Sequence, residues 1–308
     1  MWPALSAALA ALFIAAGLFA DSAAWETWLT LFVSVLLQSL PFLVLGVTVS
    51  GLIAGFVTPS LLERITPKSE TGSVAAATCA GMLLPGCECG SVPISDRLMR
   101  GGVAPAAALA FMLAAPAINP VVLVSTAVAF PGQPEMVAAR FLASFVVALG
   151  IGMLWTRRDR SAALERATAG TDTEATRTET FVGTIVHDFL HAGGFLVVGA
   201  AAAAAIQAFL PQSLLSTLGS LPVISVLAMA SLAIVLSICS EADAFFAASF
   251  TQVSPTAQLA FMVTGPVVDL KLVSMQTGVF GARFASRFAP ITVAAAILAS
   301  VVMGWLLL

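Results

Sequence analysis

The stretch VAPAAALAFMLAAP at residues 103–116 returns 150 positions later as VSPTAQLAFMVTGP at 253–266. Eight of the fourteen positions are identical, and the Pro, Phe and Met residues coincide in one register. Because chance similarity between Ala-rich segments would not align these residue types together, we interpret the two stretches as copies of one repeat. The chain is therefore predicted to consist of two related halves.

The two halves extend beyond this stretch and are separated by a polar segment. The same offset aligns Cys89 with Cys239, and upstream FLVLG at 42–46 matches FLVVG at 195–199. Residues 157–181 are polar and poor in large apolar side chains, which is typical of a flexible linker. We therefore predict an N-terminal transmembrane helix in 1–27, a first repeat in 28–156, a cytoplasmic linker in 157–181 and a second repeat in 182–308.

The composition indicates an integral membrane protein. Of the 308 residues, 59% are hydrophobic and only 9% are charged, and the mean hydropathy is +1.02. A soluble domain carries about 25% charged residues. The apolar runs are long enough for spans of about 20 residues and lack the alternation of a membrane barrel, so we expect an all-α polytopic protein. The first run, 2–20, has no positively charged flank and is expected to be an uncleaved extra span.

The distribution of Lys and Arg predicts that the two repeats are inverted. In the first half, basic residues follow the first long helix and the cysteine segment, whereas the equivalent stretches 210–222 and 249–255 hold none. The pattern is reversed at the last loop of each half. Residues 131–136 in the first half include no basic residue, whereas Arg283 and Arg287 lie in the equivalent loop of the second half. Since Lys and Arg stay on the cytoplasmic side, the two halves are expected to have opposite orientations in the membrane.

Each repeat is expected to contain a re-entrant hairpin and a broken helix, which gives seven spans and two hairpins in total. The hairpin tips are LPGCECG at 84–90 and SICSEADAF at 237–245, and Pro116 and Pro266 mark the breaks. Irregular backbone at membrane depth is tolerated only where it is buried or lines a cavity. The tips are therefore expected to meet near the midplane, where inverted-repeat transporters bind their substrates.

Three cysteines at these tips are candidate metal ligands. Cys87 and Cys89 would point the same way in an extended tip, with Glu88 pointing opposite, and Cys239 would come from the facing tip. Thiolates suit soft ions such as Zn²⁺ and Cu⁺, and by the same argument trivalent arsenic. The alternative is that small buried cysteines only allow close packing of the backbone. The spacing alone leaves both interpretations open.

Ionisable residues at membrane depth are the other candidates for a substrate site. Such residues mark ion paths or proton relays by default. Asp269 and Lys271 alternatively form a structural pair, and Glu241 and Asp243 alternatively cap a half-helix. Asn119, beside Pro120, is expected to satisfy backbone groups at its break. The candidate substrate-binding set is Cys87, Glu88, Cys89, Asn119, Cys239, Glu241, Asp243, Asp269 and Lys271.

The remaining motifs are weaker indications of a functional site. His187 and His191 are four residues apart on one helix face, a spacing that can hold a metal, but ordinary interfacial histidines are the preferred interpretation. The sequence has no phosphate-binding glycine loop, no zinc-protease motif and no basic nucleic-acid patch. We expect no cofactor, and any uphill transport then needs an ion gradient or a partner.

The motifs CECGSVPI, AFMLAAPAINPVVL, CSEADAFFAASF and GPVVDLKL resemble a family of bacterial predicted permeases. This family includes ArsP, the exporter of trivalent organoarsenicals, and the resemblance is strongest to its two-component membrane permease subunit branch. It covers residues 28 to 290. It implies a permease of the bacterial inner membrane and, for that branch, a second small membrane protein as partner.

Three classes of function follow from these features. The leading hypothesis is a secondary transporter that expels a small soft metal, metalloid or thiol-reactive species and is not an enzyme. The second is a membrane thiol–disulfide oxidoreductase, although CECG lacks the usual CxxC spacing and a bridge between residues two apart would be strained. The third is a subunit of a membrane complex that does not itself transport.

Overall fold

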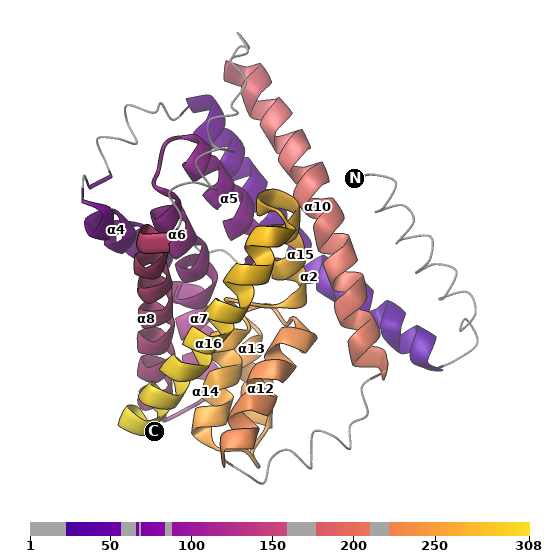
Figure 1. Ribbon diagram of the computed structural model, residues 1–308. Coiled ribbons are helices and arrows are strands. Elements are labelled where there is room, and N and C mark those ends of the chain that lie inside the picture. The colour runs from indigo at the N-terminus through magenta and orange to yellow at the C-terminus, as the bar shows by residue number, and fades with distance from the viewer. Residues whose placement is uncertain (1–22, 57–65, 68, 84–87, 159–176, 210–221) are drawn as a thin grey trace.

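The computed structural model describes residues 23–56, 66–67, 69–83, 88–158, 177–209 and 222–308 (Figure 1). These residues form helices and short connections, and none of them belongs to a strand. Helices suit so apolar a chain because each helix satisfies its own backbone hydrogen bonds. The predicted all-α fold is confirmed.

The helices follow the same order in both halves of the chain. Among the described residues, each half has one long helix, then four short helices and then a second long helix. The first half contains α2 (Ala23–Phe56), α4 (Glu70–Leu83), α5 (Glu88–Arg100), α6 (Pro105–Ala117), α7 (Pro120–Ala129) and α8 (Pro134–Arg158). The second half contains α10 (Arg177–Phe209), α12 (Pro222–Leu236), α13 (Asp243–Ser249), α14 (Pro255–Thr264), α15 (Leu270–Phe280) and α16 (Ala282–Leu307).

Each long helix packs against its counterpart from the other half. Helix α2 contacts α10, and α8 contacts α16. Figure 1 shows that the chain runs in opposite directions in the two members of each pair. Short helices also cross between the halves, because α5 contacts α15 and α13 contacts α7. The inverted orientation of the halves in a bilayer, and the re-entrant entry of the α4–α5 and α12–α13 hairpins, stay predictions.

Five stretches of the described residues are long and apolar enough to cross a membrane. They coincide with five of the seven spans expected from the sequence. The predicted span at 255–281 is divided into α14 and α15 by a break at 265–269. The predicted first span at 2–20 lies outside the described residues. The five stretches are Trp25–Phe56, Pro105–Ala129, Pro134–Thr156, Phe181–Ala205 and Ala282–Leu307.

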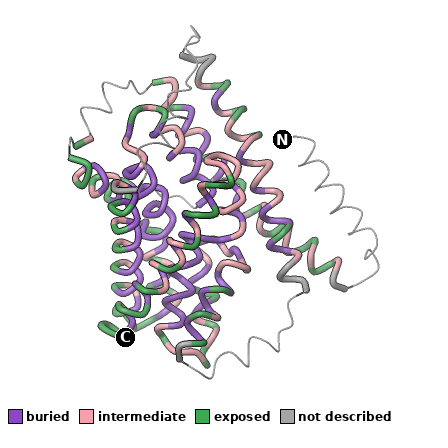
Figure 2. The backbone as a smooth tube through the Cα atoms, viewed as in Figure 1, coloured by how far each residue is buried: buried purple, intermediate pink, exposed green. Residues whose placement is uncertain are grey.

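The repeated stretch forms the centre of the molecule. Every residue of α6 after Pro105 is buried, and so are the residues of α14 from Ala257 onwards. Figure 2 shows buried residues gathered along these central helices, whereas exposed residues occur mainly on the outer ones. Membrane helices approach closely where side chains are small, which explains why α6 is rich in Ala and has no polar face.

Candidate functional site

The two helix breaks are built in the same way at equivalent positions. Asn119 precedes α7, and its Oδ1 accepts a hydrogen bond from the backbone N–H of Val122 at 3.0 Å. Asp269 precedes α15, and its Oδ1 accepts from the N–H of Leu272 at 2.6 Å. Asn119 Nδ2 also donates to the carbonyl of Ala115 at 2.8 Å. Both residues therefore cap a helix, and the predicted role of Asn119 at its break is confirmed.

Helix α5 begins inside the predicted hairpin tip. Glu88 is its first residue and Cys89 its second, and both are buried. The expectation of an extended chain over these two residues is therefore wrong. The direction of the Cys89 side chain consequently does not follow from the alternation of side chains along an extended chain. A carboxylate in the first turn of a helix interacts favourably with the helix dipole, which stabilises the helical conformation at Glu88. Cys87 lies outside the described residues.

The facing segment leads into α13 through a short turn. The backbone N–H groups of Ala242 and Asp243 donate to the carbonyl of Cys239 at 2.9 and 3.0 Å. The Cys239 thiol is buried and hydrogen-bonds the Glu241 carboxyl group. Ser237 has a φ of +48°, a conformation that costs energy for a residue other than glycine and that is often found at functional sites.

Lys271 joins the two tips. Its Nζ lies 2.7 Å from Glu88 Oε1 of the other half and 3.6 Å from Asp269 Oδ2 of its own half. It is also within electrostatic range of the thiols of Cys89 and Cys239. The expected Asp269–Lys271 pair is thus present. The sequence did not reveal that Lys271 also reaches across to Glu88.

Arg140 forms a second buried ion pair between the halves, and the sequence did not identify it as a site residue. Its Nη2 donates to Asp243 Oδ2 at 2.7 Å and to the carbonyl of Ser240 at 3.2 Å, while Nη1 donates to Thr126 Oγ1 at 2.8 Å. The Arg140 side chain is 0% exposed and that of Asp243 is 1% exposed. A basic residue inside the apolar run 134–156 was the signal that could have found it.

Several oxygen atoms of this cluster are buried without a hydrogen-bond partner. Among the described residues these atoms are Glu88 Oε2, Glu241 Oε2, Asp243 Oδ1, Asp269 Oδ2 and Ser240 Oγ. Buried oxygens of this kind are costly unless another group satisfies them. Among the described residues, which exclude Cys87, no three His, Cys, Asp or Glu side chains lie as the ligands of one metal ion would. Lys271 is thus paired with carboxyl groups from both halves and lies within electrostatic range of the thiols of Cys89 and Cys239.

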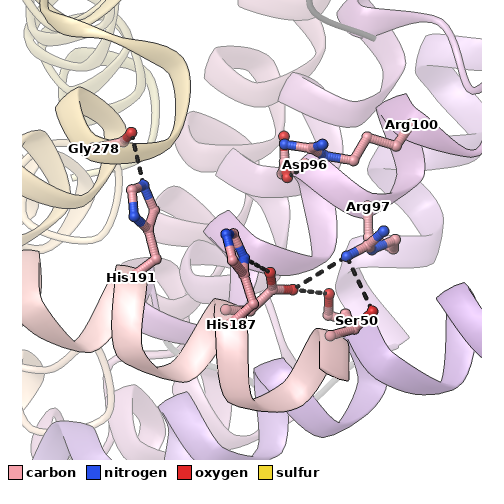
Figure 3. A network of polar contacts seen from close by, with 9 residues as sticks. Ser50, Asp96, Arg97, Arg100, His187, His191 and Gly278 are labelled. Atoms are coloured by element: carbon pink, nitrogen blue, oxygen red, sulfur yellow. Dashed lines mark hydrogen bonds and ion pairs between the residues drawn. The ribbon is translucent and has the colours of Figure 1, made fainter. Parts of the chain in front are cut away.

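The histidines belong to a different network, shown in Figure 3. The rings of His187 and His191 stack with centroids 5.7 Å apart, and His191 Nε2 contacts the Gly278 carbonyl at 3.1 Å. His187 Nδ1 lies 3.2 Å from Asp188 Oδ1, and Asp188 Oδ2 accepts from Ser50 Oγ at 2.6 Å. This network joins α2, α10 and α15 and has the features of a structural contact.

The family assignment rests on most of the chain. The family described as "Predicted permease" matches residues 24–305. The chain belongs to this family. This permease is 38% identical to the protein YcgR of Bacillus subtilis (strain 168) over 262 residues, which are 83% of this chain and 89% of the relative. No solved structure matches this chain.

The name of a second relative describes a subunit of a membrane complex. The permease is 32% identical over 268 residues to a Streptococcus mutans serotype c protein provisionally named as a two-component membrane permease complex subunit. The match covers 84% of this chain and 89% of the relative. The resemblance inferred from the motifs is confirmed. With five candidate spans, the permease is a multi-pass bacterial membrane protein.

Proposed function

We propose that this permease is a secondary transporter that moves a small soft metal, metalloid or thiol-reactive species through the site around Lys271. The observation that carries the proposal is that two buried thiols from different halves, Cys89 and Cys239, both lie within electrostatic range of this one lysine. A site shared between two halves changes its shape when the halves move. Cys87, two residues before Cys89 in the sequence, is proposed as a third ligand.

The chemistry of these groups favours a thiophilic substrate. Sulfur ligands prefer soft ions over Mg²⁺ or Ca²⁺, and a bound cation lowers the pKa of the thiol that it contacts. Glu241 hydrogen-bonds the Cys239 thiol and is therefore a candidate acceptor for the proton that this thiol releases.

The helical arrangement suits alternating access between the two halves. Helix α15, capped by Asp269, begins beside Lys271, and α7, capped by Asn119, begins at the equivalent break of the first half. Transporters whose substrates lie between half-helices have broken helices of this kind. In this proposal one half rocks against the other and the substrate is expelled. Glu88 and Asp243, each paired with a base of the opposite half, position the tips.

We also propose that the permease works with a second membrane protein. The support is the name of the Streptococcus mutans relative as one subunit of a two-component complex. A thiol–disulfide oxidoreductase has less support, because the thiol of Cys239 lies beside a carboxyl group rather than in a CxxC motif.

The test is direct binding of thiophilic probes to the purified permease. We expect Cd²⁺ or arsenite to bind the wild-type protein and each of the variants Cys87→Ser, Cys89→Ser and Cys239→Ser to bind at least about tenfold more weakly, because each loses one sulfur ligand. Cys79→Ser is the matched control, because Cys79 is exposed on α4. X-ray absorption at the Cd or As edge should show sulfur ligands.

Two results would contradict the proposal. One is a wild-type permease that binds neither probe. The other is equal affinity in the wild type and in all three variants, which would leave close packing of the backbone as the role of these cysteines.

A further inference from the structure

The two buried ion pairs between the halves follow one design. Each acidic partner, Glu88 or Asp243, is the first residue of the short helix that follows the cysteine segment of its own half. Each basic partner comes from the opposite half, Lys271 for Glu88 and Arg140 for Asp243. Separating the halves at either pair therefore releases the segment that carries a thiol.

The two pairs lie at different depths. Arg140 is six residues beyond Pro134, so it lies about 9 Å from the start of α8 at a rise of 1.5 Å per residue. Lys271 lies nine residues before Phe280, which places it about 14 Å from the other end of α15. Figure 1 shows the start of α8 and the end of α15 on opposite sides of the molecule. Arg140 is thus about 9 Å along α8 from the turn at 130–134, and we infer that it lies between this turn and the Lys271 cluster.

Arg140 has hydrogen bonds both within its own half and to the opposite half. Thr126 and Arg140 both belong to the first half, so their hydrogen bond is kept when the halves move. The contacts with Asp243 and with the Ser240 carbonyl cross to the second half and must break. The Asp243 N–H in turn donates to the Cys239 carbonyl, so the pair lies about one helical turn from that thiol.

Stability alone is a poor explanation for this pair. Taking two charges out of water costs more than their attraction returns unless every remaining polar atom is satisfied. Here Arg140 Nε and Asp243 Oδ1 have no hydrogen-bond partner among the described residues. A pair that is costly, buried and shared between halves has the properties of a contact that opens and closes.

We propose that the Arg140–Asp243 pair is a gate that closes the thiol site from the side of the 130–134 turn. The inference rests on the proposed function, because it assumes that the site is reached alternately from two sides. Arg140 is a positioning residue in this role and does not contact the substrate. The Lys271–Glu88 pair lies deeper and does not close that side.

The experiment measures how quickly a membrane-impermeant maleimide labels Cys239 from each side of sealed vesicles. The full-length background carries Cys79→Ala, Cys87→Ser and Cys89→Ser, so that Cys239 is the remaining thiol. A separate Gln133→Cys reporter, placed in the exposed turn, identifies the side that is tested. The test variant is Arg140→Gln/Asp243→Asn, which removes the ion pair and leaves no unpaired charge.

We expect labelling from the Gln133 side to be on the order of tenfold faster in the double variant, and labelling from the other side to be unchanged. Ser144→Ala is the matched control, because Ser144 is a buried residue one turn along α8 that takes no part in an ion pair. It should label at the background rate.

An unchanged labelling rate in a folded double variant, or equal acceleration from both sides, would overturn the gate. If the double variant elutes as aggregate, Arg140→Lys replaces it, because it keeps the charge but loses the forked contact. Faster labelling from the Gln133 side then supports the gate, and the background rate rejects it. Labelling needs no bound ion, so this result is separate from the Cd²⁺ and arsenite binding test.

Discussion

Asp269 and Asn119 hold equivalent positions and cap equivalent helices, yet only Asp269 carries a charge. Asn and Asp cap helices almost equally well. Capping therefore explains why a short polar side chain stands at each break, and it does not explain the carboxylate in the second half. The ion pair between Asp269 and Lys271 gives the carboxylate a second contact, and we predict that this residue also couples transport to a cation or proton gradient.

Replacing Asp269 with Asn separates these two roles. Asp269→Asn should fold with a stability within about 1 kcal/mol of the wild type, because the cap is retained. It should bind Cd²⁺ and exchange it across proteoliposomes, but it should lose transport against a gradient. Asp269→Ala is the comparison that loses the cap as well. Uphill flux at the wild-type rate in Asp269→Asn would leave capping as the role of this residue.

At the scale of helices, the sequence predicted order and breaks better than it predicted contacts. The repeat and the prolines located the α6–α7 and α14–α15 breaks, because an interior proline removes a hydrogen bond and kinks or breaks a helix, although Pro41 and Pro290 lie inside the continuous helices α2 and α16. The helical conformation of Glu88 and Cys89 was missed, because a dipole interaction near a helix end has no periodic signature. The position of Arg140 inside an apolar run was a visible signal, but its pairing with Asp243 was missed because a single sequence does not show which residues 103 positions apart are in contact.

Two matching glycines set the spacing between helices in the two halves. Gly46 of α2 ends FLVLG, and a Cβ there would lie 2.3 Å from the Cα of Gly90 in α5. Gly199 of α10 ends FLVVG, and a Cβ there would lie 2.7 Å from the Cα of Lys271. Both contacts meet backbone, which cannot rotate away as a flexible side chain can.

Gly46→Ala and Gly199→Ala should therefore each destabilise the permease by about 1–3 kcal/mol, through overpacking at the helix contact. Gly183→Ala is the control, since a Cβ at Gly183 of α10 meets nothing within 4 Å. Thermal unfolding of the detergent-solubilised protein, followed by tryptophan fluorescence, measures the difference. Equal midpoints for Gly46→Ala and Gly183→Ala would show that α2 and α5 can separate at little cost.

At the scale of the whole molecule, opposite chain directions and the charge distribution support the same topology from different evidence. Helices α8 and α16 are counterparts that run in opposite directions in Figure 1. Independently, the turn before α8 holds no Lys or Arg, whereas Arg283 and Arg287 begin α16. A pair of antiparallel counterparts in a membrane necessarily starts on opposite sides.

Single cysteines placed in these two starts test the inverted topology. Gln133 and Ser286 are both exposed, so Gln133→Cys and Ser286→Cys in a background without native cysteines should fold and label readily. Because basic residues remain in the cytoplasm, an impermeant maleimide added to intact cells should label position 133 and leave position 286 unlabelled until the cells are opened. An added cysteine in the linker after Arg158 should behave like position 286. Labelling of 133 and 286 from the same side would exclude the inverted arrangement in the membrane and would require α8 and α16 to begin on the same side.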